Sequence, residues 1–360
     1  MGAVAGLSER NKGEQRMILI SGYYGCGNSG DEAVLAALCS DLVSLGVDPS
    51  EITVLSGNPE ETAALHKVSA VPRSNFPAIV RAVRRSRLLI SGGGSLLQDS
   101  TSWRTVPYYL LIIQLALSFG CKVVIYGQGI GPVSSRVYQR WIKSVFSRVH
   151  GISVRDAGSA QLLQDWGLDE SVIITAADPV FNLQLDHRAT APGLTINLRP
   201  YPTLQADFYR WVDLINSWKS GLNLDVRFAA LGPGDAEIGR KLQQEIPELE
   251  FIIAEDWNSA FRLMSAAEIC VSMRLHGLIF AALGGSAPLG LCYDPKVAAV
   301  SSQLGIKVSS PQPDQDLTAE LVQVRADRDD YLRRLAERVE LMRTLSKKNR
   351  DVLAAAVRNK

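Results

Sequence analysis

The sequence carries almost no net charge and lacks the composition of a nucleic-acid-binding, fibrous or disordered protein. Its 360 residues include 38 Lys and Arg against 37 Asp and Glu, a formal net charge of +1. Nucleic-acid-binding proteins usually show a basic excess, so we expect no nucleic-acid partner. Hydrophobic residues make up 46% and charged residues 21%, which is typical of a folded chain. Any affinity for anions must therefore come from where individual cations stand.

Cysteine pairs and long hydrophobic runs are also missing. The five cysteines form no C-x-x-C pair and no zinc spacing, which favours small core residues in a reducing compartment. The most apolar run, residues 106–120, is shorter than the roughly 20 residues that span a bilayer, and it predicts a buried helix. Residues 1–16 contain no long apolar stretch, so we expect a disordered leader and not a secretory signal. The sequence thus predicts a cytoplasmic protein.

Several catalytic signatures are absent as well. The chain has no P-loop, no H-E-x-x-H zinc motif and no G-x-S-x-G nucleophile elbow. Short Asp-x-Asp pairs occur only at 314/316 and 327/329, beside or within a helical stretch, where they are typical of caps and solvated faces. The sequence accordingly predicts no metal site.

Apolar strands and amphipathic helices alternate along most of the chain. The predicted strands are residues 17–21, 51–56, 87–91, 122–126 and 152–154, then 194–199, 224–231, 250–254, 268–272 and 287–293. Continuous apolar strands that alternate with helices predict parallel sheets covered on both faces. The alternation of strands and helices is interrupted at residues 178–192, which form a candidate linker. The predicted units are a leader (1–16), an N-terminal Rossmann-like domain (17–185), a C-terminal Rossmann-like domain (193–310) and a helical segment (316–360).

Ligands of such sheets bind at the carboxyl ends of the strands, where the first loop is rich in glycine. Gly25, Gly27 and Gly30 match G-x-G-x-x-G between a predicted strand and helix. The second strand is followed by residues 56–58, which offer no acid for a ribose, and this argues against a dinucleotide. Three interpretations stay open: a dinucleotide site, a site for a sugar or small ligand, and a tight structural turn.

The same loop ends in acidic residues. Ser29 and Glu32 match a capping box, with Asp31 beside them. Carboxylates at the positive, N-terminal end of the helix weaken its electrostatic attraction for a pyrophosphate. We therefore favour a sugar or small ligand whose hydroxyl groups bind Asp31 or Glu32.

Three further strand ends carry unusual residues. Residues 91–99 include three glycines, which suit either an anion-binding nest or a sharp turn, and Gln98 and Asp99, which suit carbohydrate contact. The glycine loop at 127–132 is interpreted as mainly structural. Arg155 ends the next strand, either as an anion ligand or as one partner of an ion pair at the sheet edge.

The second half supplies a histidine and two cations at strand ends. Arg274 and His276 follow the strand at 268–272, and Lys296 stands in the first turn of a helix, where the helix dipole disfavours a cation. Each could be structural. Together with Arg155 they offer three fixed cations and one acid–base group, which suits a small substrate carrying both a carboxylate and a phosphate.

These motifs, in this order, resemble the polysaccharide pyruvyl transferase family, most of all its CsaB type. The resemblance rests on SGYYGCGNSGDEAVL, SGGGSLLQD, GQGIGP, SVRD, ADPVF, SMRLHGLIFAA and YDPKV, which run from about residue 19 to 300. It implies a GT-B-like fold, in which two doubly wound Rossmann-type domains face each other across a cleft and a long C-terminal helix returns to the first domain. It also implies that the catalytic residues are Arg155, Arg274, His276 and Lys296.

The resemblance further implies the reaction. A pyruvyl group would pass from phosphoenolpyruvate to an amino sugar, often N-acetylmannosamine of a lipid-linked or polymeric cell-wall glycan, forming a cyclic ketal and releasing phosphate. Neither a metal nor an organic cofactor is expected, and the product would anchor S-layer-type proteins. Loops of the first domain would hold the acceptor. The candidate residues there are Gly25, Asn28, Asp31, Glu32, Gly93, Gly94, Gln98, Asp99 and Gln128.

Two other functions stay open. A nucleotide-sugar glycosyltransferase of cell-surface polysaccharide synthesis would share the fold, and a non-catalytic glycan-binding scaffold would share the surface. The arginines at 81, 84, 85 and 87 form either a solvated helix face or a peripheral contact with anionic lipid at the inner face of the cytoplasmic membrane.

Overall fold

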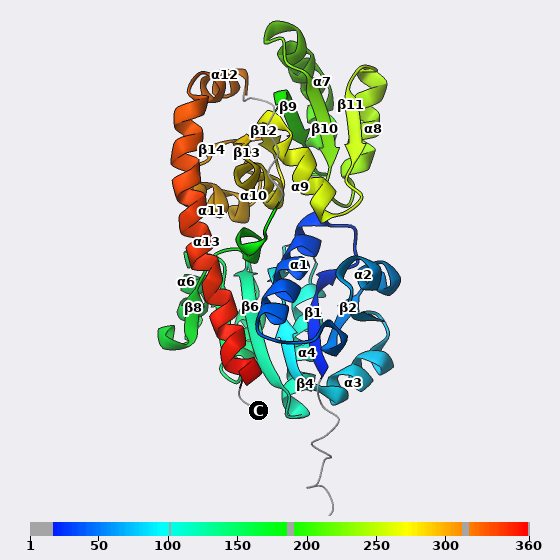
Figure 1. The fold of residues 1–360 in the computed structure, drawn as a ribbon, viewed down its shortest axis with the longest axis vertical. Coiled ribbons are helices and arrows are strands. Elements are labelled where there is room, and N and C mark those ends of the chain that lie inside the picture. The colour runs from blue at the N-terminus through cyan, green and yellow to red at the C-terminus, as the bar shows by residue number, and fades with distance from the viewer. Residues whose placement is uncertain (1–16, 101, 186–190, 312–316, 359–360) are drawn as a thin grey trace, which may run out of the picture.

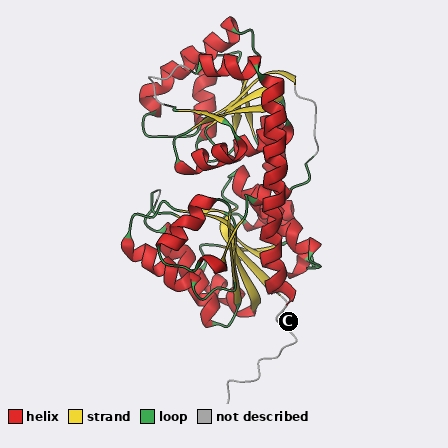
Figure 2. Cartoon of the chain, turned by 90° about the vertical axis from the view of Figure 1, so that its left-hand side faces the viewer, coloured by secondary structure: helices red, strands yellow, loops and turns green. Residues whose placement is uncertain are grey.

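The computed structural model describes residues 17–100, 102–185, 191–311 and 317–358. The predicted leader, residues 1–16, lies outside this part of the chain, as do 186–190 of the predicted linker. The described residues form two parallel sheets, each with helices on both faces, and a long C-terminal helix that lies beside both (Figures 1 and 2). The predicted α/β fold of two doubly wound domains is confirmed.

The first sheet has eight strands in the order β3-β2-β1-β4-β6-β7-β8, with β5 paired to β6. The strands are β1 (Met17–Tyr24), β2 (Ile52–Ser56), β3 (Ser69–Pro72), β4 (Ser86–Ser91), β5 (Gly94–Leu97), β6 (Lys122–Ile130), β7 (Gly151–Val154) and β8 (Ile173–Thr175). The central strands are buried on both faces, which is why they appear in the sequence as unbroken apolar runs.

The helices around this sheet are α1 (Ser29–Ser44), α2 (Pro59–His66), α3 (Phe76–Arg85), α4 (Thr105–Ser118), α5 (Arg136–Phe146) and α6 (Ala157–Asp165), with short 3-10 turns η1 (Pro49–Glu51), η2 (Glu170–Val172) and η3 (Pro179–Asn182). All of these α-helices except α4 begin where a side chain accepts a backbone N–H. Asn28, Asn58 and Asn75 cap the first three, and Ser135 and Asp156 cap α5 and α6. These caps place the helix starts at the carboxyl edge of the sheet.

The second sheet has six strands in the order β11-β10-β9-β12-β13-β14. The strands are β9 (Ala191–Asn197), β10 (Val226–Ala230), β11 (Glu250–Ile253), β12 (Ala267–Ser272), β13 (Ala287–Leu291) and β14 (Lys307–Ser309). The helices are α7 (Leu204–Gly221), α8 (Asp235–Glu245), α9 (Trp257–Ser265), α10 (Leu275–Gly284) and α11 (Pro295–Leu304).

Four short strands, β3, β5, β8 and β14, were not predicted from the sequence. They have three or four residues each, and β3 and β8 are largely exposed, so they show no continuous apolar run. Strand β6 is longer than predicted and continues to Ile130, so much of the glycine loop at 127–132 is strand.

The C-terminal segment forms two helices, α12 (Thr318–Ala326) and α13 (Arg328–Arg358). Leu335, Val339 and Met342 of α13 are buried. Helix α13 starts against β13 and α11 of the second domain and ends against β6, β7 and η3 of the first (Figure 1). The return of this helix to the first domain agrees with the predicted architecture.

The two domains meet at the start of α1. Ala33, Val34 and Ala37 belong to the same buried apolar cluster as the core of the second sheet. The Ser29 N–H donates to Leu231 O at 3.0 Å, which ties the start of α1 to the loop after β10. This contact fixes the floor of the cleft between the carboxyl ends of the two sheets.

No helix in the described part of the chain combines the length and the apolar character needed to cross a membrane.

Candidate active site

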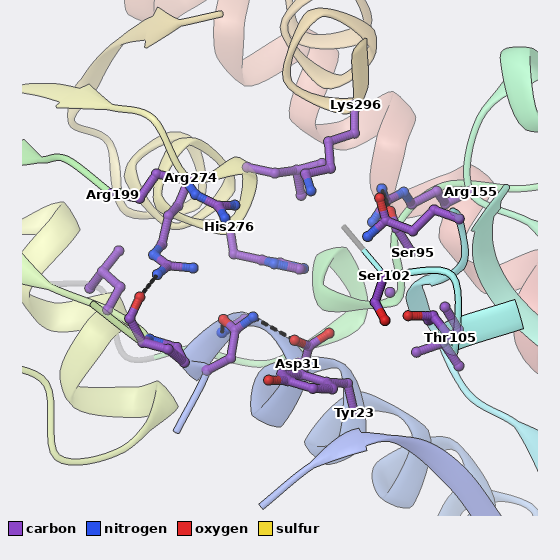
Figure 3. A pocket seen from close by; sticks show the side chains of 18 of the residues that line it. Tyr23, Asp31, Ser95, Ser102, Thr105, Arg155, Arg199, Arg274, His276 and Lys296 are labelled. Atoms are coloured by element: carbon purple, nitrogen blue, oxygen red, sulfur yellow. Dashed lines mark hydrogen bonds between the residues drawn. The ribbon is translucent and has the colours of Figure 1, made fainter. Parts of the chain in front are cut away.

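A cavity of about 580 Å³ lies between the two domains and is lined by strand-end loops of both sheets (Figure 3). Eight of the predicted site residues line it: Asn28, Asp31, Gly94, Gln98, Arg155, Arg274, His276 and Lys296. The sequence therefore located the cleft correctly, because the carboxyl ends of parallel strands gather at one edge of each sheet.

His276 enters the cavity from the first turn of α10. Its Nε2 lies 3.5 Å from Asp178 Oδ2 and is buried without a hydrogen-bond partner among the described residues. On the other side the ring lies against Gly30 of α1, across the domain interface. His276 thus lines the cavity with its Nε2 close to a carboxylate, an arrangement that suits an acid–base group.

Asp178 stands between His276 and Arg155. The carboxylate is 3% exposed, accepts the Val180 N–H at 3.1 Å and lies 3.5 Å from Arg155 Nη1. Burial raises the pKa of Asp178, but attraction by His276 and Arg155 outweighs it, so the pKa is lowered from its ordinary value. Asp178 is therefore an ionised carboxylate that lies beside both Arg155 and His276. It belongs to the ADPVF motif, to which the sequence assigned no role.

Arg155 is held from several sides at the end of β7. Its Nη2 donates to Ser95 Oγ at 2.9 Å, and its Nε lies 3.7 Å from Asp156 Oδ2. The guanidinium lies flat against Gly129, where a Cβ would come within 2.7 Å of it. Arg155 is therefore ion-paired, as one of the two interpretations predicted, and it also lines the cavity.

Asp31 is the carboxylate that lines the cavity from the first domain. It is 8% exposed, and its Oδ2 accepts a hydrogen bond from Asn28 Nδ2 at 2.5 Å. Burial raises the pKa of Asp31 to about 6; His276 opposes this rise, and Glu32 adds to it. Gly94 leaves room for Oδ1, since a Cβ there would lie 2.7 Å from that atom. Asp31 can therefore exchange a proton near neutral pH.

Arg274 and Lys296 form the wall on the side of the second domain. Asp235, which is fully buried, grips Arg274 through two hydrogen bonds of 2.6 Å, to Nε and Nη2. Lys296 Nζ lies 3.2 Å from Asp294 Oδ2. Burial lowers the pKa of Lys296, and nearby Arg155 and Arg199 act in the same direction against Asp294. Repulsion among these cations favours an anion placed between them.

Three arginines of the cavity were missed by the sequence analysis: Arg73, Arg104 and Arg199. Arg199 is the last residue of a predicted strand, 194–199, and stands two residues after the end of β9, so its position resembles that of Arg155. It donates to Tyr293 Oη at 2.5 Å, stacks on that ring, and keeps its Nε buried without a partner among the described residues. Arg73 follows β3, which was not predicted. It lies over the rings of Tyr23, Tyr108 and Tyr109.

Five predicted acceptor residues do not line the cavity, and two of them brace the first loop. The Gly25 N–H donates to Glu32 Oε1 at 2.7 Å, and Glu32 Oε2 lies 2.9 Å from His66 Nε2. The predicted capping box is wrong: α1 starts one residue earlier, Asn28 is its cap, and Glu32 reaches back to Gly25. Gly25 has φ +66°, and a Cβ there would lie 2.0 Å from Ser56 Oγ.

The other three support neighbouring loops. Gly93 faces Val34, which a Cβ would approach to 2.6 Å. Asp99 accepts the backbone N–H groups of Ser134 and Ser135 at the start of α5. Gln128 is fully buried and donates weakly to Gly92 O at 3.4 Å. The structure shows these side chains within the loops and not at the cavity wall.

Replacing Gly30 with Ala tests the contact between α1 and His276. A Cβ at Gly30 would lie 2.1 Å from His276 Nδ1, so the imidazole must move. We expect any turnover that depends on His276 to fall about tenfold, since a small misplacement of a catalytic group is costly. Gly158→Ala is the matched control, because Gly158 lies in the first turn of α6 and a Cβ there meets only Asp156 Oδ1, at 3.4 Å. Equal activities of the two variants would contradict a role for this contact.

The profile of the polysaccharide pyruvyl transferase family matches residues 28–289, most of the chain. The chain belongs to this family. The match begins at the cap of α1 and ends within β13, so it includes Arg155, Asp178 and His276. No curated protein is significantly similar to the chain in sequence.

Solved structures with the same fold include several proteins of sugar metabolism. HepE of Anabaena, solved in complex with UDP-glucose, is 10% identical with a TM-score of 0.62, over 94% of this chain and 99% of that one. UDP-GlcNAc 2-epimerase of Neisseria meningitidis is 12% identical with a TM-score of 0.64, over 94% and 99% of the two chains. A glycosyltransferase of Rickettsia africae is 11% identical with a TM-score of 0.60, over 96% and 99%. At this identity the likeness concerns the fold, and it confirms the predicted GT-B-like architecture.

Proposed function

We propose that this family member is a pyruvyl transferase of the CsaB type, which moves the pyruvyl group of phosphoenolpyruvate onto two hydroxyl groups of a sugar. One observation carries the proposal. A single cleft combines a wall of cations with His276, which the buried and ionised Asp178 supports from behind, and with Asp31, whose pKa is raised to about 6. That set can bind a small dianionic donor and move protons beside it.

Phosphoenolpyruvate would lie against Arg155, Arg199 and Lys296. Its carboxylate and phosphate are groups that guanidinium binds in paired, charge-assisted hydrogen bonds. An anion at this place relieves the repulsion that contributes to the lowered pKa of Lys296. Two hydrogen bonds to Asp235 hold Arg274 in a fixed orientation. Arg274 adds positive charge to the same wall of the cavity.

The reaction can be written so that atoms and electrons balance. His276 protonates C3 of the enol, which becomes the methyl group, while the first sugar hydroxyl bonds to C2 and returns its proton to His276. The bond from C2 to the phosphate oxygen then breaks as the second hydroxyl bonds to C2, and Asp31 accepts the proton of that hydroxyl and passes it to the departing phosphate. Cations of the wall stabilise the departing charge. The enol phosphate is already activated, so the proposal needs neither a metal nor an organic cofactor.

The acceptor would occupy the side of the cavity that belongs to the first domain. Asn28, Asp31 and Gln98 lie there and can bind sugar hydroxyl groups. We propose an amino sugar as acceptor, N-acetylmannosamine of a lipid-linked cell-wall glycan precursor, in a cytoplasmic reaction whose product anchors S-layer-type proteins.

A lipid-linked acceptor would bring the protein to the inner face of the membrane as a peripheral contact. Of the four arginines at 81–87, Arg84 stacks on Phe119 and Arg87 donates to Val357 O at 3.4 Å. Sedimentation with anionic liposomes at low and high salt tests this contact, and an absence of salt-sensitive binding would remove it.

One experiment decides the function. The protein is incubated with phosphoenolpyruvate and a panel of lipid-linked amino-sugar disaccharides, and phosphate release and the mass gain of the glycan are measured. A matched acceptor with one hydroxyl of the pair methylated should give no ketal. Turnover with a nucleotide sugar in place of phosphoenolpyruvate would support a glycosyltransferase instead. Glycan binding without turnover of any donor would support the scaffold.

Replacing Arg199 with Gln tests the donor side. We expect the KM for phosphoenolpyruvate to rise roughly tenfold or more, because a charge-assisted hydrogen bond contributes about 1.5–3 kcal/mol. The KM of the acceptor should stay close to that of the wild type. Lys241→Gln is the control, since Lys241 pairs with Glu237 on the surface of α8. A rise in the acceptor KM alone would place Arg199 on the wrong side of the cavity.

A further inference from the structure

Two fully buried polar side chains of α13 bind the segment that carries Asp178. Ser346 Oγ donates to Asp178 O at 2.9 Å, and Asn349 Nδ2 donates to Ala177 O at 2.8 Å. Both side chains are 0% exposed. Helix α13 thus holds two consecutive carbonyl groups of a stretch that belongs to no strand or helix, just before η3.

These two bonds fix the backbone from which the Asp178 carboxylate projects. Its Oδ1 accepts the Val180 N–H, while Oδ2 lies 3.5 Å from both His276 Nε2 and Arg155 Nη1. Oδ2 is therefore shared between a guanidinium and an imidazole group from different domains. A rotation of the peptide between Ala177 and Asp178 would change both distances at once.

The other side of this segment leaves it no room to move. Gly127 of β6 lies directly against Pro179, so closely that a Cβ would come within 2.5 Å of Pro179 Cγ and within 3.4 Å of Asn349 Oδ1. The turn after Asp178 is thus enclosed between the glycine-rich end of β6 and α13. Displacement of either support would change the position of the carboxylate.

The polar residues stand out on an otherwise apolar face of α13. Leu335, Val339, Met342 and Leu353 bury aliphatic side chains on that face. Asn349 leaves its Oδ1 buried without a partner among the described residues, which costs stability. An apolar residue would avoid this cost. The amide of Asn349 therefore serves to orient the segment at Ala177 and Asp178 rather than to bury apolar surface.

At its other end the same helix is fixed to the second domain. Tyr331 Oη donates to Pro288 O at 2.6 Å and accepts the Lys307 N–H at 3.3 Å. Because α13 is continuous between Tyr331 and Asn349, it sets the position of the Asp178 segment relative to the sheet that carries His276.

We infer that Ser346 and Asn349 of α13 are positioning residues of the active site, which act by aiming Asp178 at His276. This inference rests on the proposed function where it concerns turnover. The contact itself can be tested without any activity.

The test is a double-mutant cycle in the full-length protein. Ser346→Ala and Asn349→Ala should each lower kcat about tenfold and leave the KM for phosphoenolpyruvate near that of the wild type. In an Asp178→Asn background the same two changes should have no further effect, because residues that act through one group are not additive. Equal fold losses in both backgrounds would overturn the inference and leave α13 a merely structural role.

A second measurement does not depend on turnover. The chain has four histidines, so the imidazole NMR signal of His276 can be assigned with His276→Ala. Ser346→Ala and Asn349→Ala should move this signal in the same direction as Asp178→Asn. Val352→Ala is the matched control, since Val352 packs on Gly151 from the same helix, and it should lower thermal stability without moving the signal. An unmoved His276 signal in the α13 variants would overturn the inference, whereas a wild type that turns over no phosphoenolpyruvate would overturn only the proposed function.

Discussion

His276→Ala is expected to abolish most pyruvyl transfer, with a loss of turnover of 10²- to 10⁴-fold, the usual contribution of a general acid–base group. The imidazole lines the cavity, and its Nε2 lies 3.5 Å from Asp178 Oδ2. The change opens space toward the cleft, so folding should be little affected. Phosphate release under saturating donor and acceptor measures the loss.

His150→Ala is the control for this variant. His150 lies at an exposed turn before β7, where its Nδ1 accepts the Val123 N–H, and it is not part of the cavity. It should keep wild-type turnover. If His276→Ala retained more than about a tenth of the activity, a group other than His276 would carry the proton.

Much of this site could be predicted from the sequence by looking for polar residues that follow the ends of predicted strands. Arg155, His276 and Lys296 were singled out because each follows an apolar strand, and the structure places all three in one cavity. The rule works because parallel strands of both domains point their carboxyl ends at the same cleft. Arg199 follows the same rule and was overlooked.

Other features depend on packing that no local pattern reveals. Asp178 acquires its partners only when the segment after the first sheet folds under α10 and against α13. Arg274 looked like an anion ligand beside His276, but Asp235, from the start of α8, holds its Nε and Nη2. Arg73 follows a strand too short and too exposed to stand out. In each case the partner is far away in the sequence.

The glycines also differ in whether the sequence alone explains them. The loop at 22–32 predicted tight turns, which Gly25 confirms with its positive φ. The reason for Gly30 lies elsewhere: it is helical, and His276 of the other domain occupies the place of its side chain. A sequence motif records the need for glycine without showing which of these two causes applies.

Asp31→Asn is expected to stabilise the protein above neutral pH while reducing its activity. Burial raises the pKa of Asp31 to about 6, so the folded state holds a proton that the unfolded chain, with an ordinary pKa of 3.8, has already released. The stability that Asp31 contributes is therefore greatest at low pH and is lost as the pH rises through about 6. Asparagine resembles the protonated acid and removes this penalty. A shift of about two units corresponds to a gain of about 2–3 kcal/mol at pH 8, roughly half of that at pH 5 and little below pH 4.

The free energy of unfolding of Asp31→Asn and wild type, measured from pH 5 to pH 8, tests this sign directly. The difference should widen with pH and level off above 7. Asp48→Asn is the control, because Asp48 is exposed and hydrogen bonds from Ser50 lower its pKa, so it should give no gain that grows over this range. Turnover of Asp31→Asn should fall about 10²-fold, since the amide cannot accept a proton from a sugar hydroxyl. A variant that is less stable at pH 8, or whose stability difference does not depend on pH, would show that Asp31 is ionised and well solvated in the folded state. Asp31 thus lowers the stability of the folded protein at neutral pH and supports turnover at the same pH. Such a loss of stability in return for function is common in active sites.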